Sequence, residues 1–167
     1  MISTEPRLIP VFLNFVDQLG DRLGANVPQI VDVSSLQSLP EGSFGQAVAH
    51  FYQQNNLQPF TTGPRRKQLH DCVHVLTGYG SDPIGELEVQ AFLLGAKFHP
   101  FQLILGTGLL RVAHRQVVSF PLTRPAIRQR LQAAYRRGRA AQFDVDTWQP
   151  EGLWQLPLNQ VQAMFRV

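Results

Sequence analysis

The sequence predicts an all-α protein, a single-domain bundle of about six or seven helices over residues 1–167 with an apolar groove. Apolar residues recur at helical spacing in several segments, and no segment alternates between apolar and polar residues for a convincing length. The chain shows no internal repeat or linker. With 167 residues, it is long enough to bury about two-thirds of its unfolded surface in one core.

The residue pattern in the first third of the chain predicts two helices. Apolar residues at helical spacing indicate an amphipathic helix over residues 6–23. Residues 26–39 are ambiguous, because only Ser34 and Ser35 suggest a helix start. Pro40 then opens a second helix, which ends in the polar run 53–56 and carries one apolar stripe formed by Phe44, Val48, Phe51 and Tyr52.

The middle of the chain predicts a helix pair joined by a short turn. Pro64 suits the first turn of a helix over residues 65–78. Asp82 is the expected N-cap of the next helix, with Pro83 at its first position, and this helix runs to about residue 98.

Three further helices are predicted beyond this pair. Residues 101–120 are apolar on almost every side, which is typical of a buried central helix, of a groove lining or of a segment resting on a membrane. Thr123 caps the following helix, which ends near Gly138, and a short final helix covers residues 157–165.

The densest set of metal-ligating residue types lies within residues 65–86. At about 100° per residue, His70 and His74 lie roughly 40° apart on one helix face, with Asp71 about 60° from His74. Glu86 begins the next helix, which the short turn folds back against the first. Cys72 points away and is expected in the core.

Two imidazoles with one or two carboxylates suit a divalent cation with a position left open for water or substrate. The nitrogens favour zinc, and magnesium or manganese fits better if carboxylates dominate. Two alternatives stay open: Asp71 can hold an imidazole tautomer, and Glu86 can serve the helix N-terminus. Lys67 shares the metal face and Gly78 leaves room beside it, so both are candidate substrate-binding residues.

The motif resembles a known family. HDCVH, eleven residues and then Glu86 match the HDxxH(x11)E signature of the fourth protein of coenzyme Q (ubiquinone) biosynthesis. The segments 134–143 and 153–165, with Trp148 between them, are similar to that family's closing pattern. The resemblance implies that His70, Asp71, His74 and Glu86 bind a metal, usually zinc.

The resemblance further implies an all-α protein that associates with membranes and binds a polyprenylated quinone precursor or prenyl phosphate. Two roles follow: an enzyme for oxidative decarboxylation of the head group, or a scaffold that presents lipid to other biosynthetic enzymes. The absence of a transit peptide suggests a bacterial relative, in the cytoplasm on the inner membrane face, with a homodimer as an open alternative.

Charge and composition agree with this class. The net charge of +3 is compatible with anionic lipid, phosphate-bearing ligands or nucleic acid, and it decides nothing alone. The single Cys excludes an internal disulfide and fits a reducing compartment. No apolar run reaches the ~18 residues that a membrane span requires. No aromatic-basic pattern indicates nucleic acid. One group of arginines is either a solvated helix face or a contact for an anionic bilayer: Arg124, Arg128, Arg130, Arg136, Arg137 and Arg139.

Two other metal-dependent classes are alternatives. A phosphohydrolase of the HD type needs an upstream His and a distant Asp, for which His50 and Asp144 are the candidates. A zincin-like peptidase uses Glu where HDCVH has Asp71, one methylene short of the metal-bound water. The peptidase is therefore disfavoured.

Overall fold

The computed structural model describes residues 26–97 and 123–167, and these residues confirm the all-α prediction. Within these two ranges no strand forms, and the only β-type pairings are isolated bridges. The predicted helices over 6–23 and 101–120 lie outside the described residues. The elements are α2 Val33–Gln37, α3 Phe44–Gln54, α4 Arg65–Gln68, α5 His70–Thr77, α6 Pro83–Ala96, α8 Arg124–Ala140, the 3-10 helix η1 Pro150–Gly152 and α9 Leu158–Phe165.

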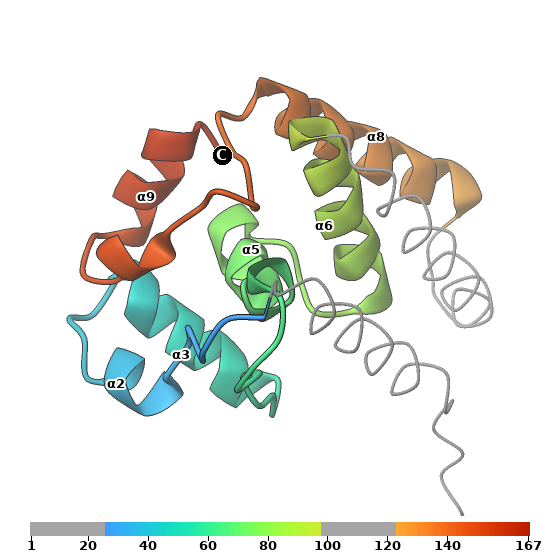
Figure 1. Ribbon diagram of the computed structural model, residues 1–167. Coiled ribbons are helices and arrows are strands. Elements are labelled where there is room, and N and C mark those ends of the chain that lie inside the picture. Colours follow the sequence, from blue (N-terminus) through green and yellow to red (C-terminus); the bar gives the residue numbers. More distant parts are fainter. Residues whose placement is uncertain (1–25, 98–122) are drawn as a thin grey trace, which may run out of the picture.

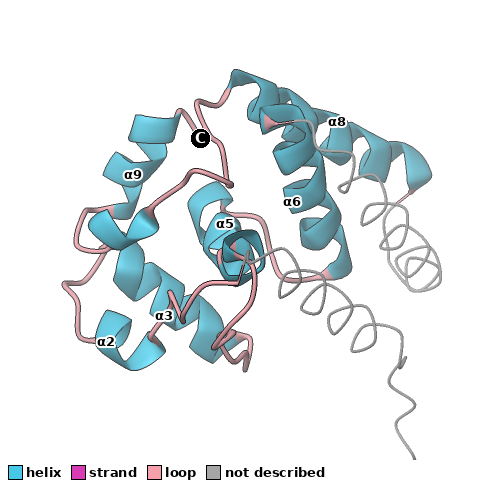
Figure 2. Ribbon diagram, in the orientation of Figure 1, coloured by secondary structure: helices cyan, strands magenta, loops and turns pink. Residues whose placement is uncertain are grey.

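Helix α5 occupies the centre of the described part (Figure 1). It contacts α3, α6 and α9, and α2 packs on the outer side of α3. Helix α8 pairs with α6 at the opposite side from α2 (Figure 1). Within each of the two described ranges, loops and turns connect consecutive helices (Figure 2). The helix that carries the two motif histidines is therefore surrounded by other elements.

Capping side chains set the helix starts. Asp82 accepts hydrogen bonds from the backbone N–H groups of Ile84 and Gly85, and Pro83 follows it, as predicted. Helix α3 instead begins after Ser43, whose hydroxyl accepts from the backbone N–H of Gln46, so the predicted start at Pro40 was wrong.

The ambiguous stretch 26–39 also contains a helix. Asp32 caps α2 by accepting from the backbone N–H groups of Ser34 and Ser35. This cap holds the pKa of Asp32 at about 2, because the two serine hydroxyls also donate to its carboxylate.

The single helix predicted over 65–78 is divided into α4 and α5, which corrects that prediction. The break falls at Leu69, whose side chain is fully buried. Gln68 explains it: its amide oxygen accepts from the Ile30 N–H at 2.9 Å, and its nitrogen donates to the Val27 carbonyl at 2.9 Å. These hydrogen bonds to backbone groups about 40 positions away in sequence fix the end of α4, and a new helix, α5, begins at His70.

The core beside α5 is rich in aromatic rings. Phe143 lies against Trp148 with ring centroids 5.1 Å apart and against Phe165 at 5.6 Å, while Phe44 stacks on Trp154 at 5.3 Å. These residues come from α3, α9 and the loop after α8, so they join the C-terminal segment to the earlier helices. Cys72 is fully buried, as predicted.

Glycines allow α6 and α8 to approach closely. A Cβ at Gly95 would lie 2.2 Å from the Tyr135 carbonyl oxygen, and one at Gly138 would lie 2.0 Å from the Phe92 carbonyl oxygen. The same pair is joined by Arg130, which donates from Nε to the buried carboxylate of Glu88 at 2.8 Å. This packing fixes α6, the helix that supplies the carboxylate of the candidate site.

Candidate metal centre

A tight turn brings the start of α6 back to α5. Gly78 ends α5 in the left-handed conformation (φ +74°), and its N–H donates to the His74 carbonyl at 2.8 Å. Gly85 then passes directly against Gly80, where a Cβ would lie 1.9 Å from the Gly80 carbonyl oxygen. Only a residue without a side chain allows this approach, which places Glu86 beside α5.

Three of the predicted ligands meet at this point. One ligand atom from each of His70, His74 and Glu86 lies within 4.8 Å of the other two. Nε2 of His74 is 3.2 Å from Oε1 of Glu86, and Nε2 of His70 is 3.5 Å from Oε2. The imidazole rings are 4.9 Å apart between centroids. The carboxylate therefore lies between the two rings.

The opposite side of each ring faces a hydrogen-bond acceptor. Nδ1 of His70 is 3.4 Å from the Asp71 carboxylate, and Nδ1 of His74 is 3.2 Å from the Tyr79 carbonyl oxygen. A hydrogen on each Nδ1 satisfies these acceptors and leaves the Nε2 lone pairs directed toward Glu86. Two lone pairs and a carboxylate then face one another with no hydrogen between them, an arrangement that a divalent cation stabilises.

The environment of His74 supports this interpretation. The side chain is 1% exposed, and Phe51 stacks on its ring with centroids 5.4 Å apart. Its Nε2 is buried and has no hydrogen-bond partner in the described ranges. A buried polar atom without a partner costs free energy, and a cation bound to that atom would remove the cost.

Neighbouring charged groups also shift the pKa of His70 and of Asp71. Burial favours its neutral form, but the hydrogen bond with Asp71 and the charge of Glu86 outweigh this, so the pKa of His70 is raised. Burial alone would raise the pKa of Asp71, yet His70 and the Tyr52 hydroxyl lower it. Asp71 is thus an ionised acceptor behind the His70 ring.

The other predicted site residues are Asp71, Lys67 and Gly78, and of these Asp71 contacts the group. Asp71 contacts the outer nitrogen of His70 and is not among the three grouped residues, so its role as a ligand stays a prediction. The ammonium group of Lys67 lies 4.2 Å from the centre of the Phe60 ring. A Cβ at Gly78 would meet no atom within 4 Å, which leaves space at the end of α5.

The two residues that an HD-type phosphohydrolase would need also lie outside the group. His50 is exposed on α3, and Asp144 pairs with Lys97 at 2.7 Å. Neither joins His70, His74 and Glu86 among the described residues.

Gln90 is a neighbour of the site that the sequence did not predict. Its Nε2 lies 3.4 Å from Nε2 of His70. Its position one helical turn after Glu86 puts it on the same face of α6, and that spacing could have revealed it. The Tyr79 carbonyl was also missed, and no sequence signal reports a backbone acceptor of this kind.

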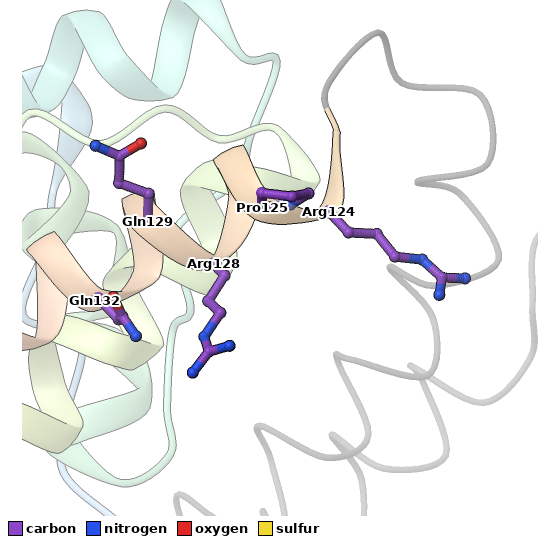
Figure 3. Close-up of a pocket in the computed structure, with 5 residues that line it drawn as sticks. All are labelled: Arg124, Pro125, Arg128, Gln129 and Gln132. Atoms are coloured by element: carbon purple, nitrogen blue, oxygen red, sulfur yellow. The ribbon is translucent and has the colours of Figure 1, made fainter.

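A separate pocket of about 340 Å³ lies on α8. It is lined by Arg124, Pro125, Arg128, Gln129 and Gln132 (Figure 3). The predicted apolar groove stays a prediction, because its expected lining over 101–120 lies outside the described residues. Within the described ranges, no helix is long and apolar enough to span a membrane.

Comparison with known proteins tests the resemblance. No family model matches the chain. Over 97 residues it is 33% identical to "Ubiquinone biosynthesis protein COQ4 homolog, mitochondrial" from Bos taurus, a match that covers 44% of this chain and 37% of the relative. The human protein of the same name is 32% identical with the same coverage. Over this stretch the chain is similar to the COQ4 proteins.

The likeness to COQ4 proteins confirms the predicted resemblance, over part of their length. The match spans a little over a third of these curated relatives. The relative from Trypanosoma brucei brucei is 30% identical over 96 residues, covering 48% of this chain and 39% of that protein.

A solved structure supports the fold. The crystal structure of a Nostoc punctiforme protein, provisionally assigned to ubiquinone biosynthesis, aligns with a TM-score of 0.66. The alignment covers 83% of this chain and 69% of that one at 20% identity. The helical arrangement is therefore shared with a protein whose structure was determined by experiment.

Proposed function

We propose that His70, His74 and Glu86 bind a divalent cation, with zinc as the first choice. The observation that carries the proposal is the convergence of two Nε2 atoms and one carboxylate, each ring being oriented from behind by an acceptor. Three protein ligands leave a coordination position open, as in sites that bind an exchangeable group. Magnesium fits less well, because two of the three ligands are nitrogens.

We further propose that the chain acts in ubiquinone biosynthesis by binding a polyprenylated quinone precursor or a prenyl phosphate. The names of the relatives support the pathway. When bound, the cation would supply a Lewis acid for a phosphate, a ring carboxylate or a ring hydroxyl. Asp71 and the Tyr79 carbonyl orient the two imidazoles, and the space beside Gly78 and the charge of Lys67 provide room and charge for the head group.

The isoprenoid tail would bind to apolar surface. Burial contributes about 0.8 kcal/mol for each methylene-sized group, so a tail of a few isoprene units supplies ample affinity. In this proposal the protein either supports oxidative decarboxylation of the head group or presents the lipid to other quinone-biosynthesis enzymes.

Helix α8 is the proposed contact with an anionic membrane surface, on the inner face of a bacterial membrane. The side of α8 that packs on α6 contains the buried residues Ala134 and Gly138. Arginines are exposed elsewhere along the helix, which contains no Asp or Glu: Arg124, Arg128, Arg136 and Arg139. Each well-placed cation contributes about 1 kcal/mol near anionic lipid.

Metal and lipid analysis of the purified protein tests the proposal. We expect about one equivalent of divalent metal per chain, with a co-purifying prenylated lipid identified by mass spectrometry. His74→Ala and the isosteric Glu86→Gln should lower both the metal content and the binding of head group, while the helical circular dichroism is retained. His50→Ala, at an exposed position outside the group, is the matched control. Unchanged metal content in both site variants would refute the site.

A further inference from the structure

The amide of Gln90 lies beside the ring nitrogen of His70 that would bind a metal ion. Nε2 of Gln90 lies 3.4 Å from Nε2 of His70, and Oε2 of Glu86 lies 3.5 Å from the same ring nitrogen. Both residues come from one face of α6, one turn apart. His70 thus meets a carboxylate and an amide from the same helix.

The two ring nitrogens of His70 have different neighbours, Asp71 at Nδ1 and the Gln90 amide at Nε2. When its Nδ1 hydrogen points to Asp71, Nε2 carries a lone pair, and the amide nitrogen of Gln90 can donate to it. An imidazole nitrogen has one lone pair in the ring plane. A cation and the Gln90 N–H therefore cannot both use it.

We propose that Gln90 is the residue that recognises an oxyanion bound to the metal. This inference rests on the proposed metal site. When a cation takes the lone pair of His70, the Gln90 N–H group loses that acceptor while its side chain remains beside His70. An anionic oxygen in the open coordination position would offer that N–H a new acceptor.

The chemistry of the ligand follows from the donor. An amide N–H group discriminates in favour of a ligand oxygen with a free lone pair, such as a phosphate or a carboxylate. The ligand class is therefore a metal-bound oxyanion. Inorganic phosphate and benzoate are the probes that distinguish a phosphate ligand from a carboxylate ligand.

The alternative role for Gln90 is that of a fourth metal ligand, through its amide oxygen after rotation of the side chain. The two roles predict opposite effects on metal affinity. Loss of a ligand weakens metal binding, whereas loss of a hydrogen-bond donor that competes for His70 does not.

Gln90→Met tests the inference on the full-length chain. Methionine keeps the length and the helix propensity of glutamine but has no N–H group. Gln37→Met, at an exposed position on α2, is the matched control. Affinity for Co²⁺ is measured by its visible absorption, and affinity of the Co²⁺-loaded protein for phosphate and for benzoate is measured by the spectral change that each causes.

We expect Gln90→Met to bind Co²⁺ at least as tightly as the parent, and up to about fivefold more tightly, because one competing hydrogen bond is lost. Its affinity for at least one of the two oxyanions should fall about fivefold or more, and the probe affected more strongly identifies the source. Gln37→Met should match the parent in each measurement.

The outcomes separate this inference from the proposed function. Weaker Co²⁺ binding by Gln90→Met would make Gln90 a ligand and overturn the inference. Unchanged affinity for both oxyanions would also overturn it, while leaving the metal site intact. If the parent chain binds no Co²⁺, both the inference and the proposed metal site are refuted.

Discussion

The crossing of α6 and α8 depends on Gly138, and its replacement gives a prediction that can be worked from the geometry. A Cβ at this position would lie 2.0 Å from the carbonyl oxygen of Phe92, where ordinary contact begins at 3.4 Å. The two helices would have to separate by about 1.4 Å, because a backbone carbonyl in the middle of a helix cannot rotate away.

The expected cost of Gly138→Ala follows from two opposing effects. Overpacking of this kind costs up to about 3 kcal/mol, and alanine recovers about 1 kcal/mol through its higher helix propensity. We expect the free energy of unfolding to fall by about 2 kcal/mol, which lowers Tm by about 4–8 °C for a chain of this length.

Urea denaturation followed by circular dichroism measures this change, with Gly152→Ala as the control. A Cβ at Gly152 would meet no atom within 4 Å, so its stability should stay within about 0.5 kcal/mol of the parent. A Gly138→Ala protein as stable as the parent would refute the close approach of α6 and α8.

Three further predictions concern charged side chains. Asp71→Asn should weaken metal binding about 10- to 100-fold in a competition titration, because the imidazole loses its ionised partner; an unchanged affinity would contradict an orienting role. Burial would raise the pKa of Glu151, but the ion pair with Arg65 outweighs this and lowers it. At this half-exposed site the pair stabilises the fold by less than about 1 kcal/mol, and this stabilisation is present above about pH 5 and is lost as the pH falls through the folded-state pKa of Glu151. Glu151→Gln should remove that part of the pH dependence of unfolding, and an identical pH profile would exclude the pair. Arg130→Met should destabilise the chain by about 1–3 kcal/mol in chemical denaturation, since it leaves the buried Glu88 without its cation, whereas a neutral effect would show that Glu88 is solvated.

Local signals predicted much of the helical framework. Asp82 and Pro83 gave the start of α6 correctly, because a cap and a first-turn proline act through neighbouring residues. The prediction that Glu86 would fold back toward His70 and His74 is also confirmed by their distances. These features depend on contacts within about 16 positions in sequence.

Features that depend on distant contacts could not be predicted from the sequence. The break at Leu69 arises because Gln68 binds backbone groups near residue 30, and no pattern within 65–78 reports this. The orientation of His74 depends on a carbonyl group, which every residue carries. Gln90 was missed because a glutamine on an apolar helix gives no distinctive motif.

X-ray absorption spectroscopy of the zinc-loaded protein tests the metal centre most directly. Two imidazole nitrogens at about 2.0–2.1 Å, with oxygen completing the shell, are the expected scatterers. A sulfur scatterer at about 2.3 Å would instead place Cys72 on the metal, and a spectrum with fewer than two imidazoles would contradict the convergence of His70, His74 and Glu86 on one cation.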